Sequence, residues 1–337
     1  MTTLERLQSI GIRRLGTPER GFRYQTADGG KVSLGDRQRI YELKIPPAWK
    51  NVAINPSPNG RVQVVGTDAA GRWQYLYHSN HTRAQGNRKF RRLVKFAEAL
   101  PKMRRRVAQD LKQQGLARER VLASILRVLS TCFLRPGSHV YASEHGSYGI
   151  STLRPKHVKV KGDIIEFDFP GKSGVRQTPQ VRDRHVARVL RTLMKHPGQL
   201  FKYENGNGSL VKVERRHINE YIKEVMGEKF SAKDFRTWAG TLMCASALAR
   251  AGIDENDSET SRKRKIVSAI KETAEVLGNT PAVCRSSYIC PEILNGFEQG
   301  RVIRDHFSKP GDFTSFRGRN LHRAETSLLK FLKRTAK

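Results

Sequence analysis

Acidic residues are scarce in this chain of 337 residues, which has 31 Asp and Glu against 63 Lys and Arg and a formal net charge of +32 at pH 7. A catalytic site in which clustered carboxylates bind two metal ions is therefore not expected. The excess of positive charge favours a polyanionic partner, with nucleic acid first. Charge alone does not distinguish a protein that only binds this partner from one that does chemistry on it.

Cysteine is also rare, and the sequence has no long apolar run. The four cysteines have spacings that match no zinc site or disulfide framework, so we expect a reducing compartment such as the cytoplasm. No segment approaches the roughly 18 apolar residues of a membrane span, and residues 1–20 are too polar for a secretory signal. We therefore expect neither a membrane partner nor secretion.

Several catalytic motifs are missing as well. The sequence has no G-x-x-x-x-G-K-[ST] phosphate loop, which leaves ATP use without support, and no G-x-S-x-G or H-E-x-x-H motif. A protein of this composition that cuts a phosphodiester is expected to do so without a metal ion or another cofactor.

The length suggests about two domains, and the sequence pattern changes near residue 85. Residues 1–85 predict a strand-rich N-terminal domain, in which Asp28-Gly29-Gly30 would form the turn of a hairpin over residues 22–34. A short helix fits residues 36–43. Further strands are expected at residues 52–54, 61–66 and 73–77, the last two joined by a turn at residues 69–72.

Residues 86–337 predict a mainly helical second domain. One buried helix face is marked by apolar residues at helical spacing, Phe90, Leu93, Val94 and Ala97. The surrounding residues 83–106 include ten Lys or Arg and a single acid. This basic run is either a solvated helix face or a strap across a phosphate backbone.

The apolar residues 121–134 predict a central helix of the second domain. Residues 157–177 predict a three-stranded antiparallel sheet, with its third strand at residues 175–177. Gly278 and Thr280-Pro281 are typical of the end of one helix and the start of the next. The other expected helices are residues 182–195, 214–226, 232–251, 259–277 and about 320–335. The fold class is therefore α+β.

A phosphodiester can be handled by cationic side chains instead of metal ions. Its transition state carries negative charge on the non-bridging oxygens, and a planar guanidinium group can hold two of these oxygens at once. A nucleophile and an acid for the leaving oxygen complete such a site. The second domain offers candidates for these roles, which are Arg135, Lys172, Lys233, Arg236, Asn279 and Tyr288.

Each candidate also has an ordinary structural explanation. Arg135 directly follows the central helix, where arginines commonly cap, and Lys172 lies in a Gly-flanked turn, where lysines are commonly solvated. Lys233 and Arg236 are three residues apart and share one face of a helix. Tyr288 lies two turns into a short helix, where a tyrosine commonly belongs to the core or the surface. Taken one at a time, these residues do not establish a catalytic site.

Taken together, they resemble a known family. The segments FPGKSG, KDFRTWAG and LGNTPAVCRSSYI, with RPG well upstream, resemble the catalytic blocks of type IB DNA topoisomerases, in particular those of the small poxvirus-like and bacterial branch. The segments RIYELKIPPAW and VVGTDAAGRWQYLYH are similar to the N-terminal clamp domain of that branch. The matches run from about residue 20 to 300 and occur in the expected order.

The resemblance implies a role for each catalytic residue. Tyr288 of SSYI matches the nucleophile, and Lys172 of GKSG matches the general acid for the 5′-oxygen. Arg135 of RPG and Arg236 of KDFR match the two arginines that hold the scissile phosphate. Asn279 stands where poxvirus-type members have a histidine. It can therefore donate a hydrogen bond but cannot titrate, which puts any acid–base role at this position in doubt.

The resemblance also implies a DNA-binding surface. Gln74, Tyr75, Tyr77 and Tyr141 match positions that contact DNA in poxvirus-type members, and Lys233 is expected to contact DNA beside Arg236. The alternative for Tyr75 and Tyr77 is an ordinary strand with both rings on one face. The implied partner is double-stranded DNA, encircled by a monomer that acts as a clamp at the bacterial nucleoid in the cytoplasm.

The implied activity is relaxation of positive and negative supercoils. One strand would be cut through a 3′-phosphotyrosyl intermediate, rotated and religated without ATP or metal. One alternative is a tyrosine recombinase, which normally carries His-x-x-Arg where this chain has Lys233 to Arg236, and a helical N-terminal domain. The other alternative is a non-enzymatic basic protein that binds DNA or RNA.

Overall fold

The computed structural model describes residues 1–254 and 256–335, with the side chains of residues 82–89 outside the description. The chain is α+β, as the sequence predicts, and it divides into two compact units, Met1–Lys89 and Phe90–Lys337. The roles of clamp and catalytic domain that we assigned to residues 1–85 and 86–337 stay predictions. No helix in the described part of the chain combines the length and the apolar character needed to cross a bilayer.

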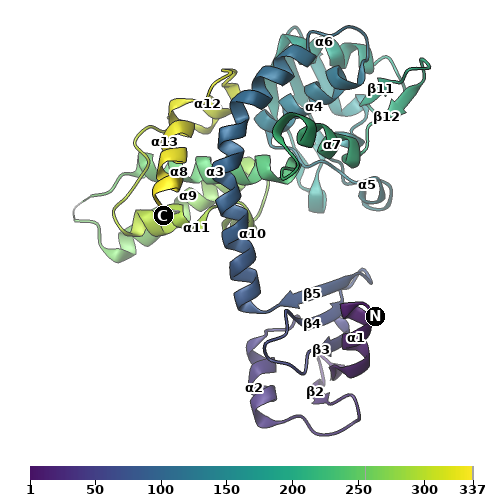
Figure 1. Cartoon of the computed structure of the whole chain (residues 1–337), viewed down its shortest axis with the longest axis vertical. Helices are drawn as coiled ribbons and strands as arrows, with labels where there is room; N and C mark the ends of the chain where they lie inside the picture. Colours follow the sequence, from purple (N-terminus) through teal and green to yellow (C-terminus); the bar gives the residue numbers. More distant parts are fainter. Residues whose placement is uncertain (255, 336–337) are drawn as a thin grey trace. The chain divides into compact units, whose positions relative to one another are not determined.

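The N-terminal unit is built on an antiparallel sheet of five strands in the order β2-β1-β3-β4-β5 (Figure 1). A short helix covers each face of this sheet. The strands are β1 (Ile12–Thr17), β2 (Gly21–Gln25), β3 (Lys50–Ile54), β4 (Val62–Thr67) and β5 (Trp73–Tyr77), and the helices are α1 (Thr3–Ile10) and α2 (Leu34–Glu42).

Alternation along β3 and β4 builds a separate core on each face of the sheet. Ala53 pairs with Val65 and packs with Leu7 of α1, whereas Ile54 pairs with Val64 and packs with Ile40 of α2. Because neighbouring residues of a strand point to opposite faces, an almost unbroken apolar strand is the expected pattern when both faces are covered. This explains why β4 is buried along its whole length.

The hairpin that we predicted at residues 22–34 is wrong. The partner of β2 is β1, and neither β1 nor α1 was predicted. The turn at Asp28-Gly29-Gly30 does form, with Thr26 N donating to the Gly30 carbonyl at 3.1 Å, but the chain after it makes an isolated bridge between Gln25 and Lys31 instead of a second strand. The reason is the start of α2. The Ser33 hydroxyl accepts a hydrogen bond from the backbone N–H of Asp36 at 3.1 Å, and this N-cap draws the following residues into a helix.

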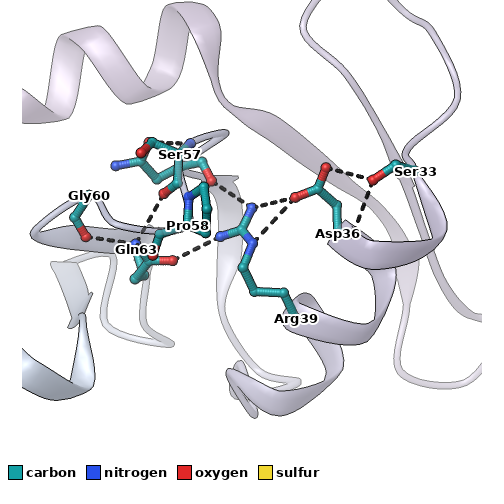
Figure 2. Close-up of polar contacts among 8 residues, drawn as sticks. Ser33, Asp36, Arg39, Ser57, Pro58, Gly60 and Gln63 are labelled. Atoms are coloured by element: carbon teal, nitrogen blue, oxygen red, sulfur yellow. Dashed lines mark hydrogen bonds and ion pairs between the residues drawn. The ribbon is translucent and has the colours of Figure 1, made fainter.

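A polar network fixes α2 against the loop between β3 and β4 (Figure 2). Arg39 of α2 donates to Asp36 Oδ1 at 2.8 Å and to Gln63 Oε1 at 2.8 Å. The amide nitrogen of Gln63 donates in turn to the carbonyls of Ser57, Pro58 and Gly60. These three carbonyls lie in the loop before β4, so the Gln63 side chain, which is buried, ties this loop to the sheet.

The second unit has one continuous hydrophobic core around α4 (Arg118–Cys132), the central helix that the sequence predicts. The long helix α3 (Ser79–Asp110) leads into this unit (Figure 1). The predicted helices are confirmed as α6 (Arg184–Leu193), α7 (Arg215–Met226), α8 (Ala232–Ala251), α9 (Glu259–Leu277), α10 (Pro281–Ser287) and α13 (Arg323–Thr335). The sequence analysis missed the shorter α5 (His139–His145), α11 (Pro291–Glu298) and α12 (Pro310–Ser315).

The three-stranded sheet of this unit differs from the prediction in its third strand. It consists of β6 (Val158–Lys161), β7 (Ile164–Phe167) and β10 (Gln180–Arg182). The residues predicted as the third strand instead form β9 (Arg176–Gln177), which pairs with β8 (Phe169–Pro170) in a separate two-residue ladder. A further hairpin, β11 (Lys202–Glu204) and β12 (Leu210–Lys212), was not predicted.

Candidate active site

Arg135 belongs to a turn whose backbone is fixed by close packing. Phe133 adopts a left-handed conformation that ends α4, and the carbonyl of Arg135 accepts a hydrogen bond from Ile150 N at 2.9 Å. Gly137 has a φ of +92°, and a Cβ on Gly149 would lie 2.5 Å from the Gly137 Cα. Both positions therefore require glycine, and their contact fixes the backbone that carries the arginine.

Arg236 reaches the same place from α8. Its side chain is almost completely buried, with 3% of the residue exposed, and its Nη2 donates to the carbonyl of Leu277 at 2.7 Å. Its Nη1 donates to the carbonyl of Phe133. Arg135 Nη2 donates to the carbonyl of Gly278 at 3.1 Å, so both arginines lie at the C-terminal end of α9. Cations are favourable at this end of a helix because the last carbonyls are unpaired.

Asn279 joins this pair through its amide oxygen, which accepts a hydrogen bond from Arg135 Nη2. Asn279 Nδ2 and Arg236 Nε are both buried, and neither has a hydrogen-bond partner among the described residues. Buried donors are rarely left unpaired in proteins. Two such donors beside two guanidinium groups are what a bound anion would satisfy.

Tyr288 is the residue that caps the C-terminus of α10, directly after the last helical residue, so our placement of it inside a helix was wrong by one position. Thr280 caps the N-terminus of this helix, and Pro281 is its first residue, as the sequence predicts. The Tyr288 ring lies 5.0 Å from the guanidinium carbon of Arg236. This contact is a cation–π interaction that places the predicted nucleophile beside one of the predicted phosphate-binding arginines.

Gly240 of α8 makes room for the tyrosine. A Cβ at this position would lie 2.8 Å from the carbonyl oxygen of Tyr288 and 3.0 Å from its Cβ. The next residue on α8, Thr241, donates from its hydroxyl to the same carbonyl at 3.2 Å. Gly240, the last residue of the KDFRTWAG block, and Thr241, the residue after the block, therefore position Tyr288.

The site is positively charged and lacks a compensating acid. Burial, followed by the charge of Arg236, lowers the pKa of Arg135 to about 10. Burial likewise lowers the pKa of Arg236, which interactions with Tyr288 oppose. Neither arginine forms an ion pair with an Asp or Glu in the part of the chain that the structure describes. Both remain charged near pH 7, which favours a negatively charged ligand.

Lys172 lies in the turn between β8 and β9, as the sequence predicts. Its side chain is exposed, and within the described residues it has no ion pair or hydrogen bond. Ser173 has a φ of +61°, so the turn includes a left-handed residue that is not glycine. The structure therefore brings together Arg135, Arg236, Asn279 and Tyr288, and holds Lys172 on an adjacent hairpin without a direct contact.

Gln177 connects this hairpin to the arginine site, and the sequence analysis missed it. A Cβ on Gly171, the residue before Lys172, would lie 2.8 Å from Gln177 Cγ. A Cβ on Gly278, the residue before Asn279, would lie 2.7 Å from Gln177 Nε2. Gln177 thus packs against both glycines. The signal available in the sequence was a polar residue in β9, the strand that follows the turn with Lys172.

Comparison with known proteins decides the family. A family model described as the catalytic core of eukaryotic DNA topoisomerase I matches residues 78–295, and one described as the N-terminal domain of bacterial DNA topoisomerase IB matches residues 21–68. The chain belongs to the type IB DNA topoisomerases. Membership makes it an isomerase, and the first of these matches includes every residue of the arginine and tyrosine site.

The relatives of this topoisomerase include viral and animal proteins. DNA topoisomerase 1B of Acanthamoeba polyphaga mimivirus is 36% identical over 289 residues, which cover 83% of this chain and 85% of that protein. DNA topoisomerase 1B of Vaccinia virus (strain Copenhagen) is 26% identical over 234 residues, covering 69% and 72%. DNA topoisomerase 1 of Drosophila melanogaster is 24% identical over 243 residues, covering 68% of this chain and 24% of that protein.

The predicted DNA contacts of the N-terminal unit of this topoisomerase lie on β5, an edge strand. Tyr75 and Tyr77 are 38% and 45% exposed, and their ring centroids are 6.4 Å apart. Gln74 donates to Asp68 Oδ2 at 2.9 Å, so the β4–β5 turn holds its amide. Two exposed rings on one strand face can stack on a ligand, but contact with DNA stays a prediction for all three residues.

The two predicted contacts in the second unit are exposed side chains. Tyr141 is 43% exposed on α5, a helix with no buried residue, and its ring lies 5.8 Å from that of His145. Lys233 is exposed, whereas Arg236, one turn further along α8, is buried. Contact with DNA stays a prediction for both Tyr141 and Lys233.

Three arginines of the basic run are neutralised within the topoisomerase. Arg92 pairs with Asp234, Arg104 with Glu325 at 2.7 Å, and Arg106 with Asp110 at 2.9 Å. The side chains of residues 83–89 lie outside the described residues. The exposed cations that could still act as a phosphate strap are Arg91, Lys95, Lys102 and Arg105.

Proposed function

We propose that the chain relaxes positively and negatively supercoiled double-stranded DNA by cutting and religating one strand. The observation that carries this proposal is the convergence at one place of the half-buried Arg135, the buried Arg236, Asn279 Nδ2 and the Tyr288 ring, with no acidic partner for either arginine and no partner for Nδ2 among the described residues. The relatives named DNA topoisomerase 1B support DNA as the substrate.

In the proposed cleavage step, the Tyr288 hydroxyl gives up its proton to water, its oxygen attacks the phosphorus, and the bond to the 5′-oxygen breaks. Arg135, Arg236 and Asn279 donate hydrogen bonds to the non-bridging oxygens, where negative charge develops. Lys172, whose side chain is exposed on its hairpin, gives a proton to the departing 5′-oxygen. The products are a 3′-phosphotyrosyl ester and a free 5′-hydroxyl.

Religation reverses this chemistry without an external energy source. The phosphotyrosyl ester conserves the free energy of the phosphodiester, so the 5′-hydroxyl can attack it and release Tyr288. Between the two steps the duplex rotates about the intact strand, which removes supercoils of either sign. We propose that a single chain encircles the duplex as a clamp and keeps the broken end at a high effective concentration. It would act in the cytoplasm, at the bacterial nucleoid.

Plasmid relaxation tests this function. The wild-type chain should relax plasmid of arbitrary sequence without ATP and in the presence of EDTA. Tyr288→Phe should bind duplex DNA normally, form no covalent adduct and leave the plasmid supercoiled. Relaxation by Tyr288→Phe would overturn the proposal, and a requirement for a pair of specific sites would favour a tyrosine recombinase instead.

The proposed acid role of Lys172 has its own test. A 5′-bridging sulfur leaves without a proton, whereas the natural 5′-oxygen needs one. Lys172→Ala should therefore cleave ordinary DNA poorly and recover on the sulfur-containing substrate. Failure to recover would remove Lys172 from this role, while the assignment of Tyr288 would stand.

A further inference from the structure

A second cluster of arginines surrounds a cavity in the unit Phe90–Lys337. This cavity has a volume of about 220 Å³ and lies among α3, α4 and the chain around α12. Its lining includes four arginines and two hydroxyl side chains: Arg104, Arg127, Arg317, Arg319, Ser130 and Thr131. The resemblance to the family assigns no role to any of these residues.

The positive charge of this cavity is only partly neutralised. Arg104 is fully engaged, because both oxygens of Glu325 accept hydrogen bonds from it at 2.7 and 2.9 Å. The carboxylate nearest to the other arginines belongs to Asp183, which lies 3.6 Å from Arg127 Nη1. Asp183 also caps α6, accepting from the N–H groups of residues 185 and 186, so its charge is shared.

Arg127 and Arg317 therefore share one carboxylate that is already partly used. Burial is the main reason that the pKa of each guanidinium is lowered, and the charge of Arg127 lowers the pKa of Arg317 further. Arg317 Nη1 donates to the carbonyls of Thr314 at 2.6 Å and Phe316 at 2.9 Å, and its Nη2 donates to the carbonyl of Arg182 at 3.3 Å. These contacts orient Arg317 without neutralising it.

Arg317 Nε is buried and has no hydrogen-bond partner within the part of the chain that the structure describes. The same holds for the Nε of Arg92, Arg120, Arg236 and Arg262, so this atom does not by itself mark a site. The cavity is marked instead by two half-buried guanidinium groups that share one carboxylate. Such a pair can hold a tetrahedral oxyanion.

We propose that this cavity binds a phosphate group, held by Arg127 and Arg317, at a place distinct from the catalytic arginines. The phosphate can belong to a small phosphate-bearing molecule or to a DNA backbone, since both present the same oxyanion. A phosphate bound in this cavity can affect the catalytic site through one layer of packed side chains. Phe313 lines the cavity and stacks on Phe133 with ring centroids 5.2 Å apart, and the Phe133 carbonyl is a partner of Arg236.

Calorimetric titration with inorganic pyrophosphate tests the proposal in the full chain. An Arg135→Ala background weakens anion binding at the catalytic site and makes the result independent of the proposed DNA chemistry. In this background we expect saturable binding that Arg127→Gln and Arg317→Gln each weaken by about tenfold or more. Arg216→Gln is the matched control, because this exposed arginine on α7 pairs with Glu214 and is not among the residues that line the cavity, so the affinity should be unchanged.

A second measurement covers the case in which a variant fails to fold. Pyrophosphate should protect Arg127 and Arg317 from an arginine-selective dicarbonyl reagent, as followed by mass spectrometry of the chain with only Arg135 changed. Displacement of pyrophosphate by a short duplex would identify the DNA backbone as the source, and no displacement would identify a small molecule. Unchanged affinity in folded Arg127→Gln and Arg317→Gln, or no protection of either arginine, would overturn the proposal.

Discussion

Arg135 Nη2 donates a hydrogen bond to Oδ1 of Asn279, although 144 residues separate them in the sequence. This bond fixes which end of the amide carries the donors, so Nδ2 is the atom left buried without a partner among the described residues. A side chain oriented in this way can stabilise a non-bridging oxygen without changing its own charge. The prediction of a neutral donor at residue 279 thus gains a geometric basis.

Substitution of Asn279 tests this donor. Asn279→Ala should slow cleavage by about 10²-fold, the usual cost of one lost oxyanion donor, with little effect on DNA affinity. Asn279→His should restore part of the rate, and the restored rate should titrate near the ordinary histidine pKa of about 6.5, whereas the wild-type residue adds no such titration. Single-turnover cleavage across pH 5–9 measures both effects, and a full rate for Asn279→Ala would exclude the donor role.

Gly240→Ala should slow cleavage even though alanine has a higher helix propensity than glycine. Alanine is favoured over glycine inside a helix by about 1 kcal/mol, so propensity alone predicts a more stable chain. The new methyl group would lie 2.8 Å from the Tyr288 carbonyl, however, and must displace the tyrosine. Because a shift of about 1 Å can cost about 10²-fold, cleavage should fall by roughly that factor.

The matched control for this variant is Gly35→Ala in α2. A Cβ at Gly35 meets nothing within 4 Å, so this change should raise the melting temperature without altering cleavage. A Gly240→Ala chain that cleaves at the wild-type rate would show that the close packing of α8 on Tyr288 does not matter for catalysis.

Gln177→Ala should loosen the hairpin of Lys172. We expect cleavage of ordinary DNA to slow by about 10- to 100-fold, because Gln177 packs between Gly171 and Gly278. A substrate with a 5′-bridging sulfur should recover most of the loss, since it does not need the proton of Lys172. Gln180→Ala, on the exposed surface of β10, is the control and should cleave normally. A loss that the sulfur substrate does not rescue would contradict the positioning role.

Arg92→Ala should weaken folding instead of DNA binding. Asp234 is buried at the start of α8, where it also accepts from the Ser231 backbone, and removal of Arg92 takes away its cationic partner. The free energy of unfolding should fall by about 1.5–3 kcal/mol, the range for hydrogen bonds to charged groups. Urea denaturation measures this change.

The salt dependence of DNA affinity distinguishes Arg92 from its neighbour. Arg91→Ala removes an exposed cation and should reduce the slope of log K against log salt by about 0.9 if that side chain binds a phosphate. Arg92→Ala should leave the slope unchanged. A reduced slope for Arg92→Ala with normal stability would reverse this assignment.

Acid should open the β4–β5 turn that holds Gln74. Hydrogen bonds, the largest from Arg72, lower the pKa of Asp68 from 3.8 to about 2. Because the carboxyl pKa is lower in the folded state than in the unfolded state, the ionised carboxylate stabilises the turn at pH values above the unfolded-state pKa. This stabilisation is lost as the pH falls through the folded-state pKa. NMR signals of the Ala70 and Arg72 amides, which donate to Asp68, should therefore titrate near pH 2. A midpoint near 4 would contradict the hydrogen-bonded turn.

Much of the second unit could be predicted because its signals are local. The helix α9 ends at Gly278, which has a positive φ, and α10 starts with Thr280 and Pro281, as these residue types predict. The lysine turn was also predictable from its flanking glycines. In contrast, the pairing of β1 with β2 was missed because Asp28-Gly29-Gly30 is a stronger turn signal than the residues between those strands.

The interactions that were not predictable are the long-range ones. Nothing in the local sequence around Gln177 indicates that it packs against Gly278, and the charge run around Arg92 gives no sign of its partner Asp234. Burial also has to be observed: Lys233 and Arg236 have the same helical spacing as any cationic pair, yet only one is buried. Such contacts and burial depend on packing between segments that are distant in the sequence, such as α8 against α3 and α9.

Mapping the covalent adduct tests most directly whether Tyr288 is the nucleophile. Wild-type chain is mixed with duplex DNA, denatured with detergent and digested, and the peptide that carries nucleotides is sequenced by mass spectrometry. We expect a nucleotide linked through its 3′-phosphate to the oxygen of Tyr288, with a free 5′-hydroxyl on the other DNA end. An adduct on a different residue, or a 5′-phosphate linkage to Tyr288, would contradict it.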